Sequence, residues 1–225
     1  MLWMWIEALV VNAVLISFAQ RTPLLTTQGW IHAGALGTIL WGSLGWRGWL
    51  AVVVYLVLGS LVTRIGFANK QRRGLAEARE GRRGPENVWG SAAVGACLAL
   101  VLGASPQDAI LWRHVVLIGF SASFAAKLAD TFGSEIGKRW GRTTLLITTL
   151  RPVAPGTDGA ISMEGTAASA VGSVLMTMAL WGLSSSQLPL IPNAMAAGVV
   201  MVVGLLATLA ESVMGAVVQN RVGWL

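Results

Sequence analysis

Long apolar stretches alternate with shorter polar ones along most of this chain, and each apolar stretch has roughly the length of a membrane-crossing helix. About 20 predominantly apolar residues are needed to cross the hydrocarbon core of a bilayer. The second stretch is the weakest match, because it contains His32 and several glycines. The pattern predicts an all-α polytopic membrane protein with about six or seven transmembrane helices. The apolar segments lie at residues 2–20, 29–46, 48–66, 88–105, 114–135, 161–183 and 194–218.

The composition favours a membrane protein over a soluble one. Only 12% of the 225 residues are charged and 55% are hydrophobic, whereas soluble domains carry about 25% charged residues. Many of the 11 tryptophans lie near the ends of the apolar segments, as in the aromatic belts at membrane interfaces. The 27 glycines suit close packing of helices in lipid. The single cysteine, Cys97, excludes a disulfide framework and a CxxC metal site within the chain.

The basic residues predict the orientation of the chain. Lysines and arginines gather in the loops at 67–87 and 136–160, which two apolar segments separate, so both loops lie on one side of the membrane. The opposite side receives only Arg47 and Arg113. Because positive charge marks the cytoplasmic side, we expect the N-terminus outside and the C-terminus in the cytoplasm. The loops also account for the net charge of +6, so no nucleic-acid partner is expected. We interpret residues 1–225 as one integral membrane domain whose first segment is a span and not a signal peptide.

The fifth apolar segment carries ionisable residues, which are costly inside a membrane unless they are paired or functional. Ser123, Lys127, Asp130 and Ser134 follow at spacings of 4, 3 and 4, which places them on one face of a helix. Glu135 lies one ridge away. Lys127 and Asp130 are expected to pair, which lowers the cost of holding both in lipid. The pair either fixes helix packing or belongs to a site that a water-soluble substrate reaches from the cytoplasm.

The loop at 136–160 combines glycines, threonines and cations, a mixture that suits phosphate groups. It is not a Walker loop, because GxxxxGK[ST] is absent. The alternative is an ordinary cytoplasmic loop that contacts anionic lipid headgroups. The candidate phosphate-binding residues of this loop are Lys138, Arg142, Arg151, Gly156, Thr157 and Gly159.

The sequence PGTDGAISMEGT opens the sixth apolar segment and adds two carboxylates, Asp158 and Glu164. Together with Asp130 and Glu135 at the same membrane depth, they predict a site for a Mg²⁺–nucleotide complex, because Mg²⁺ prefers carboxylate, phosphate and water oxygens. Alternatively, Asp158 or Ser162 caps a helix whose N-terminus points at phosphate. Both interpretations are compatible with each other.

The last apolar segment contains Glu211, followed by Ser212. By the predicted topology this carboxylate lies near the cytoplasmic end, level with Asp130. An ionisable residue inside a membrane is a functional candidate by default. The alternative is a protonated glutamate that serves packing.

The loop at 67–87 is basic with interspersed glutamates, and most such loops only set topology. Its RRGPEN run is less ordinary. We treat Arg82, Arg83 and Asn87 as a second tier of candidates for phosphate binding.

Four blocks of the sequence resemble a known family: KLADTFGSEIGK at 127–138, PGTDGA at 155–160, SMEGT at 162–166 and ESVMGAVVQ at 211–219. They are similar to the membrane-embedded phytyl-phosphate kinases of the vitamin E pathway, which belong to a wider integral membrane family of unknown function. The resemblance covers most of the chain. Its central blocks are long and specific, and its N-terminal part is generic.

This resemblance implies transfer of a phosphoryl group from a nucleoside triphosphate, with CTP as the expected donor, to phytyl phosphate. The product would be phytyl diphosphate for tocopherol and phylloquinone synthesis. Mg²⁺ is the expected cofactor, and a bacterial or cyanobacterial cell membrane or a thylakoid membrane the expected location. The catalytic candidates are Lys127, Asp130, Glu135, Glu164 and Glu211. The candidates for nucleotide and phosphate binding are Asn87, Ser134, Lys138, Arg142, Arg151, Gly156, Thr157, Gly159 and Ser162. The candidate metal ligands are Asp130, Glu135, Asp158 and Glu164.

Two other classes of function are considered for a chain with these residues. A transporter or flippase for a phosphorylated lipid or a small anion would use the intramembrane charges as a relay. Its substrate path would continue to the far face, where the loops are short and nearly uncharged. A structural membrane subunit would need no such density of ionisable groups at one depth.

Overall fold

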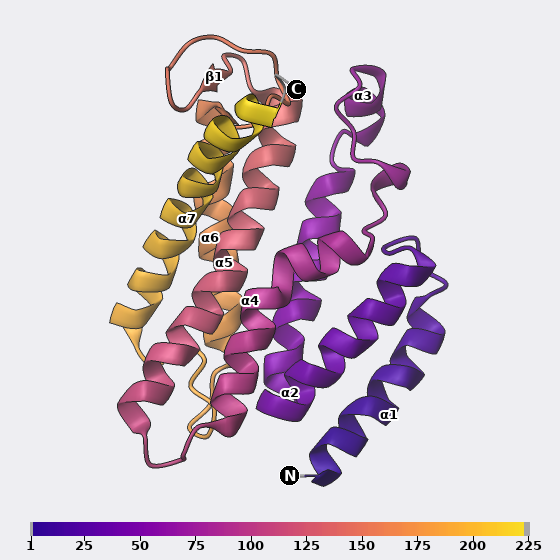
Figure 1. Ribbon diagram of the computed structural model, residues 1–225, viewed down its shortest axis with the longest axis vertical. Helices are drawn as coiled ribbons and strands as arrows, with labels where there is room; N and C mark the ends of the chain where they lie inside the picture. The colour runs from indigo at the N-terminus through magenta and orange to yellow at the C-terminus, as the bar shows by residue number, and fades with distance from the viewer. Residues whose placement is uncertain (1, 223–225) are drawn as a thin grey trace.

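The computed structural model describes the backbone of residues 2–222 and the side chains of residues 2–218, and it is a bundle of long helices (Figure 1). Within the described part of the chain, six helices are long and apolar enough to cross a membrane. They are α1 (Leu2–Ala19), α2 (Thr27–Arg64), α4 (Pro85–Ala104), α5 (Ile110–Trp140), α6 (Met163–Leu183) and α7 (Ala194–Val222). The prediction of an all-α membrane protein is confirmed. The side chain of Gln219, in the last of the four sequence blocks, lies outside the described residues.

Helix α2 covers both the second and the third predicted segments and folds back on itself between them. Its 38 residues would extend about 57 Å if the helix were straight. Instead Arg64 Nη2, at its end, donates to the carbonyl of Pro23, just before its start, at 3.3 Å. The reversal lies at Gly45, where φ is 69° and ψ is −173°, a backbone conformation open to glycine because it lacks a Cβ. Figure 1 shows the first half of α2 running back alongside α1 and the second half returning toward α3.

Both predicted loops are partly helical and lie at the same end of the bundle. The first contains α3 (Phe67–Arg72) and a 3₁₀ turn, η1 (Arg79–Gly81). The second begins after α5, which continues five residues past its predicted end at 135, and holds the two-stranded ribbon β1 (Leu145–Leu146) and β2 (Ala160–Ile161). Arg73 Nη1 donates to the carbonyl of Lys138 at 3.1 Å, which joins the two loops. Helix α1 starts at the opposite end of the bundle (Figure 1). The cytoplasmic assignment of the loops stays a prediction.

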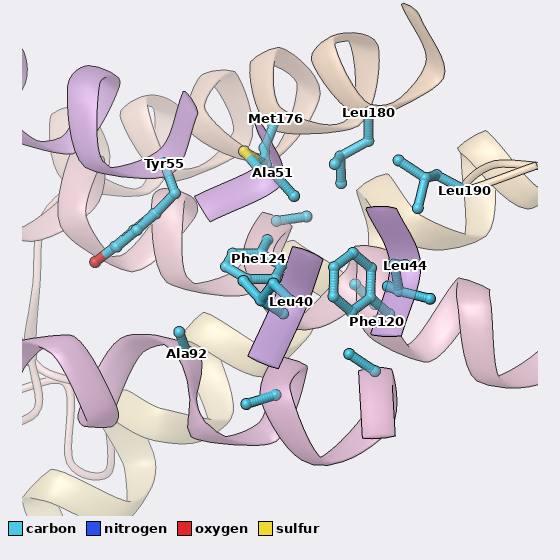
Figure 2. Close-up of a cluster of buried hydrophobic side chains, with 14 of the residues drawn as sticks. Leu40, Leu44, Ala51, Tyr55, Ala92, Phe120, Phe124, Met176, Leu180 and Leu190 are labelled. Carbon is cyan, nitrogen blue, oxygen red and sulfur yellow. The ribbon is translucent and has the colours of Figure 1, made fainter. Parts of the chain in front are cut away.

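Helix α5 lies at the centre of the bundle and packs against α2, α4, α6 and α7. Phe120 and Phe124 of α5 are fully buried, with ring centroids 5.1 Å apart. Side chains of α2 and α6 surround them, among them Leu40 and Met176 (Figure 2). Because α5 is held on several sides, the polar residues of its last three turns keep fixed positions relative to α6 and α7.

Candidate active site

A polar cavity of about 380 Å³ lies where α5, α6 and α7 meet the loop that joins α5 to α6. Its wall contains residues from 130–138, 144–169 and 208–215, which are far apart in the sequence. Thr144, Thr166, Ser169, Thr208 and Ser212, which are not among the predicted site residues, add hydroxyl groups to the wall. The predicted site residues that line it are Asp130, Ser134, Lys138, Gly156, Thr157, Asp158, Gly159, Ser162 and Glu211.

Small residues bring the walls of the cavity together. A Cβ added to Gly133 of α5 would lie 2.1 Å from the Ser169 hydroxyl of α6, and one added to Gly165 would lie 2.8 Å from the Gly133 carbonyl. Gly159 has a φ of +76°, and a Cβ there would meet the Cβ of Ala216 at 2.4 Å. The glycines of this region therefore serve close backbone approach, between α5 and α6 and between the loop and α7.

We expect Gly159→Ala to lift the α5–α6 loop from α7, because the new methyl group occupies the place of Ala216. Trypsin should then cleave after the exposed Arg142 in this loop faster than in the unchanged protein. Gly74→Ala is the matched control, since Gly74 has a similar φ of +67° but no atom within 4 Å of the added Cβ. Equal cleavage rates in the two variants would contradict the proposed packing role of Gly159.

The N-terminus of α6 opens into the cavity. Ser162 caps the helix, and its hydroxyl accepts a hydrogen bond from the amide of Gly165 at 3.1 Å. The sequence hypothesis of a cap at Ser162 is confirmed. The first amides of a helix carry partial positive charge and bind anions, so this side of the cavity suits phosphate. Glu164, in the first turn, is half-buried and does not line the cavity.

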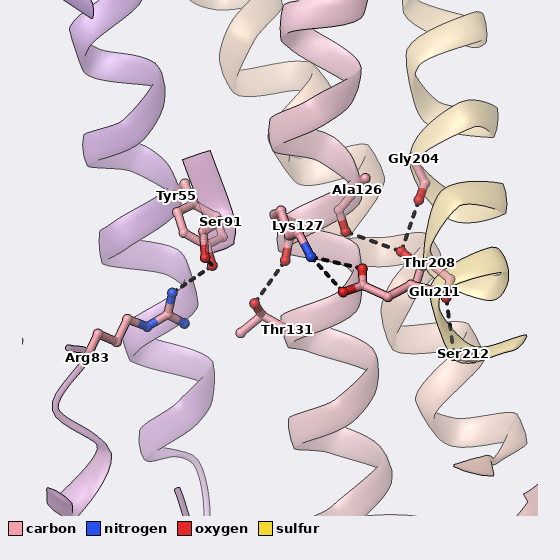
Figure 3. Close-up of polar contacts among 10 residues, drawn as sticks. All are labelled: Tyr55, Arg83, Ser91, Ala126, Lys127, Thr131, Gly204, Thr208, Glu211 and Ser212. Atoms are coloured by element: carbon pink, nitrogen blue, oxygen red, sulfur yellow. Dashed lines mark hydrogen bonds and ion pairs between the residues drawn. The ribbon is translucent and has the colours of Figure 1, made fainter. Parts of the chain in front are cut away.

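Lys127 pairs with Glu211 of α7. Its ammonium donates to both carboxylate oxygens, at 2.7 and 2.9 Å (Figure 3). The predicted direct pairing of Lys127 with Asp130 is therefore wrong: spacing along one helix does not reveal a carboxylate on a neighbouring helix. The Thr208 hydroxyl donates to the Ala126 carbonyl at 3.2 Å and holds α7 against α5 beside the pair.

The Asp130 carboxylate lines the cavity, and within the part of the chain that the structure describes no side chain hydrogen-bonds to it or lies within ion-pair distance. A half-buried carboxylate without a partner is costly unless something binds it. A cation that Asp130 binds together with the phosphate oxygens of a ligand would neutralise this carboxylate. Lys138 also lines the cavity, and its positive charge, which it shares with Glu135 at 3.3 Å, suits those phosphates.

Glu135 lies outside this cavity. Its carboxylate is 1% exposed and pairs with Lys70 of α3, which is completely buried. The Lys70 ammonium also donates to the Thr63 carbonyl at 2.8 Å, and Lys138 lies 3.3 Å from the other Glu135 oxygen. Glu135 thus ties α3 to α5. Lys70 is one of several cations in its loop, and the charge pattern alone does not distinguish it as the buried one.

Several other predicted residues lie away from the cavity as well. Arg142 and Arg151 are exposed on the α5–α6 loop. Asn87 accepts a hydrogen bond from the Gly84 amide at 3.0 Å and so caps α4. Among the residues with described side chains, no three His, Cys, Asp or Glu lie close enough to hold a metal ion. The structure therefore does not gather the four predicted metal ligands, although Asp130 and Asp158 share the cavity.

Comparison with known proteins places the chain in a family. Residues 10–223 match the family described as integral membrane protein DUF92. The chain belongs to this family. The predicted resemblance to a wider integral membrane family is confirmed, and with it the integral membrane location. No solved structure matches the chain.

Relatives of this DUF92 chain occur in bacteria, plants and archaea. It is 44% identical to the uncharacterized membrane protein sll0875 of Synechocystis sp., over 98% of this chain and 83% of that protein. It is 37% identical to the chloroplastic protein VTE6 of Arabidopsis thaliana, over 97% of this chain and 64% of the plant protein. It is 30% identical to an uncharacterized membrane protein of Methanocaldococcus jannaschii, over 75% of this chain and 67% of that protein.

Proposed function

We propose that this protein is a lipid-phosphate kinase that transfers a phosphoryl group from CTP to phytyl phosphate and releases phytyl diphosphate. The observation that carries the proposal is the cavity in which three features meet: Lys138, the N-terminus of α6, and the Asp130 carboxylate, which has no ion-pair or hydrogen-bond partner among the described residues. The four sequence blocks that resemble phytyl-phosphate kinases contain every predicted site residue that lines this cavity. The similarity to VTE6 over almost the whole chain supports the same choice.

The donor set of the cavity fits magnesium. Asp130, Asp158, Ser134 and Thr157 offer oxygen ligands only, and Mg²⁺ is typically bound by one or two carboxylates together with phosphate oxygens and water. When bound, Mg²⁺ would neutralise charge on the transferred phosphoryl group. In this proposal Asp130 and Asp158 hold the metal or its waters, and the buried Glu135 has a packing role.

The chain's other residues position the two phosphate-bearing substrates. Lys138 balances phosphate charge, and the first amides of α6 bind phosphate oxygens. Lys127 keeps Glu211 in a fixed place at the rim. The acceptor is already a phosphate and needs no general base, so positioning and charge neutralisation supply most of the rate enhancement.

The direct test incubates purified protein with phytyl phosphate, Mg²⁺ and each nucleoside triphosphate in turn, and measures phytyl diphosphate by mass spectrometry. We expect product, with CTP the best donor. Absence of product with every nucleotide would overturn the proposal. Movement of phytyl phosphate across liposomes without nucleotide would favour the transporter instead.

Removal of the metal gives a separate prediction. Excess EDTA should abolish product formation, and Mg²⁺ added beyond the chelator should restore it, because two cavity carboxylates and a triphosphate repel each other without a cation between them. Product formation that continues in EDTA would contradict the assignment of Asp130 and Asp158. The thermal unfolding midpoint without nucleotide, measured alongside, shows whether the chelator affects the fold.

A further inference from the structure

A second cavity, of about 300 Å³, lies between α1, α2 and α4. It shares no lining residue with the polar cavity. Most of its wall is apolar, with Ile16, Leu36, Val52, Leu56 and Val88 among the side chains that form it. Its volume is at the lower end of the range for ligand pockets, about 300–1,000 Å³. An apolar cavity of this kind suits a hydrocarbon chain.

One cation breaks the apolar lining. Arg83 is only 7% exposed, and no described carboxylate lies within 4 Å of it. Its Nη1 donates to the Tyr55 hydroxyl at 2.7 Å, and its guanidinium carbon lies 5.1 Å from the centre of the Tyr55 ring. A Cβ added at Gly59 would lie 2.8 Å from Nη2. Neutral groups therefore hold the guanidinium in place, and a buried charge without an opposite charge nearby costs free energy.

One residue of the same wall also carries an unsatisfied donor. The indole nitrogen of Trp30 is buried and has no hydrogen-bond partner among the described residues. The other indole in the wall, that of Trp49, donates to the Asn12 side chain at 2.9 Å. Arg83 thus lacks a counter-ion among the described residues, and Trp30 lacks an acceptor. An anionic oxygen group would suit the cation and could also accept from the indole.

We propose that this cavity binds an anionic phospholipid of the bilayer, with the phosphate paired to Arg83 and one chain against the apolar wall. Charge complementarity selects the headgroup, because Arg83 has no counter-ion among the side chains that the structure describes. The bilayer is the source because α1, which closes the cavity on one side, exposes apolar side chains such as Leu9, Val10 and Phe18 to the surrounding lipid. The site is independent of the proposed kinase reaction.

The test uses native mass spectrometry of the full-length protein, delipidated in detergent and titrated with dioleoyl phosphatidylglycerol or dioleoyl phosphatidylcholine. We expect one tightly bound phosphatidylglycerol and at least tenfold weaker binding of the zwitterionic lipid. Arg83→Gln should weaken phosphatidylglycerol binding about tenfold or more, since a charge-assisted contact is lost. Arg82→Gln is the matched control, because Arg82 is the adjacent cation, half exposed and outside the cavity, and it should leave the affinity unchanged.

A second variant keeps the test decisive if Arg83→Gln fails to fold. Ala33→Phe fills the cavity and leaves Arg83 in place, whereas Ala35→Phe puts the same ring on the exposed side of the same helix. Loss of the bound lipid in Ala33→Phe alone supports the proposal. Equal binding in the two variants, equal affinity for the two phospholipids, or tighter binding of phytyl phosphate than of phosphatidylglycerol at this cavity overturns it.

Discussion

Asp130→Asn is expected to lower the turnover number for phytyl diphosphate formation by roughly 10³-fold, which is the scale reported for removing a group that stabilises charge in phosphoryl and acyl transfer. The replacement keeps the shape of the side chain and removes its negative charge. Because Asp130 has no hydrogen-bond or ion-pair partner among the described residues, the fold should be unaffected. The measurement is the rate at saturating CTP and Mg²⁺, with the unfolding midpoint as a check.

The matched control is Asp108→Asn, which removes a carboxylate from the exposed turn between α4 and α5. Its rate should equal that of the unchanged protein. A fully active Asp130→Asn enzyme would show that this carboxylate has no part in the reaction, even if the protein is a kinase.

Glu135→Leu is expected to lower the free energy of unfolding by about 3–5 kcal/mol, because it leaves the completely buried Lys70 ammonium without a counter-charge. The double variant Lys70→Met with Glu135→Leu should recover most of that loss, since a buried ion pair replaced by apolar side chains of similar size is often neutral. Unfolding in mixed micelles with increasing sodium dodecyl sulfate, followed by circular dichroism, measures both.

The comparison pair is Arg79 with Glu86, whose side chains are 47% and 57% exposed. Removing Glu86 in the same way should cost about 0–1 kcal/mol, as exposed ion pairs do. If Glu135→Leu destabilises the protein no more than this, Glu135 is not a packing residue, and its predicted role in metal binding regains support.

Asp130 lines the polar cavity whereas Glu135 is buried against α3, and helix geometry explains the difference. Asp130 and Glu135 are both acidic and both lie in the last turns of α5, and the sequence predicts both as metal ligands. Five positions on a helix correspond to about 500° of rotation, so the two carboxylates point in different directions. Which direction faces α6 and α7, and which faces α3, depends on how the helices pack.

The sequence alone determined the membrane class, the helical fold and the blocks that form the polar cavity, because apolar length and intramembrane charge are local properties of the chain. The tertiary structure decided the partners: Glu211 for Lys127, Lys70 for Glu135, and a neutral tyrosine for Arg83. It also decided that α2 turns back at Gly45. These contacts join residues far apart in the chain, and their geometry follows from packing that no local pattern specifies.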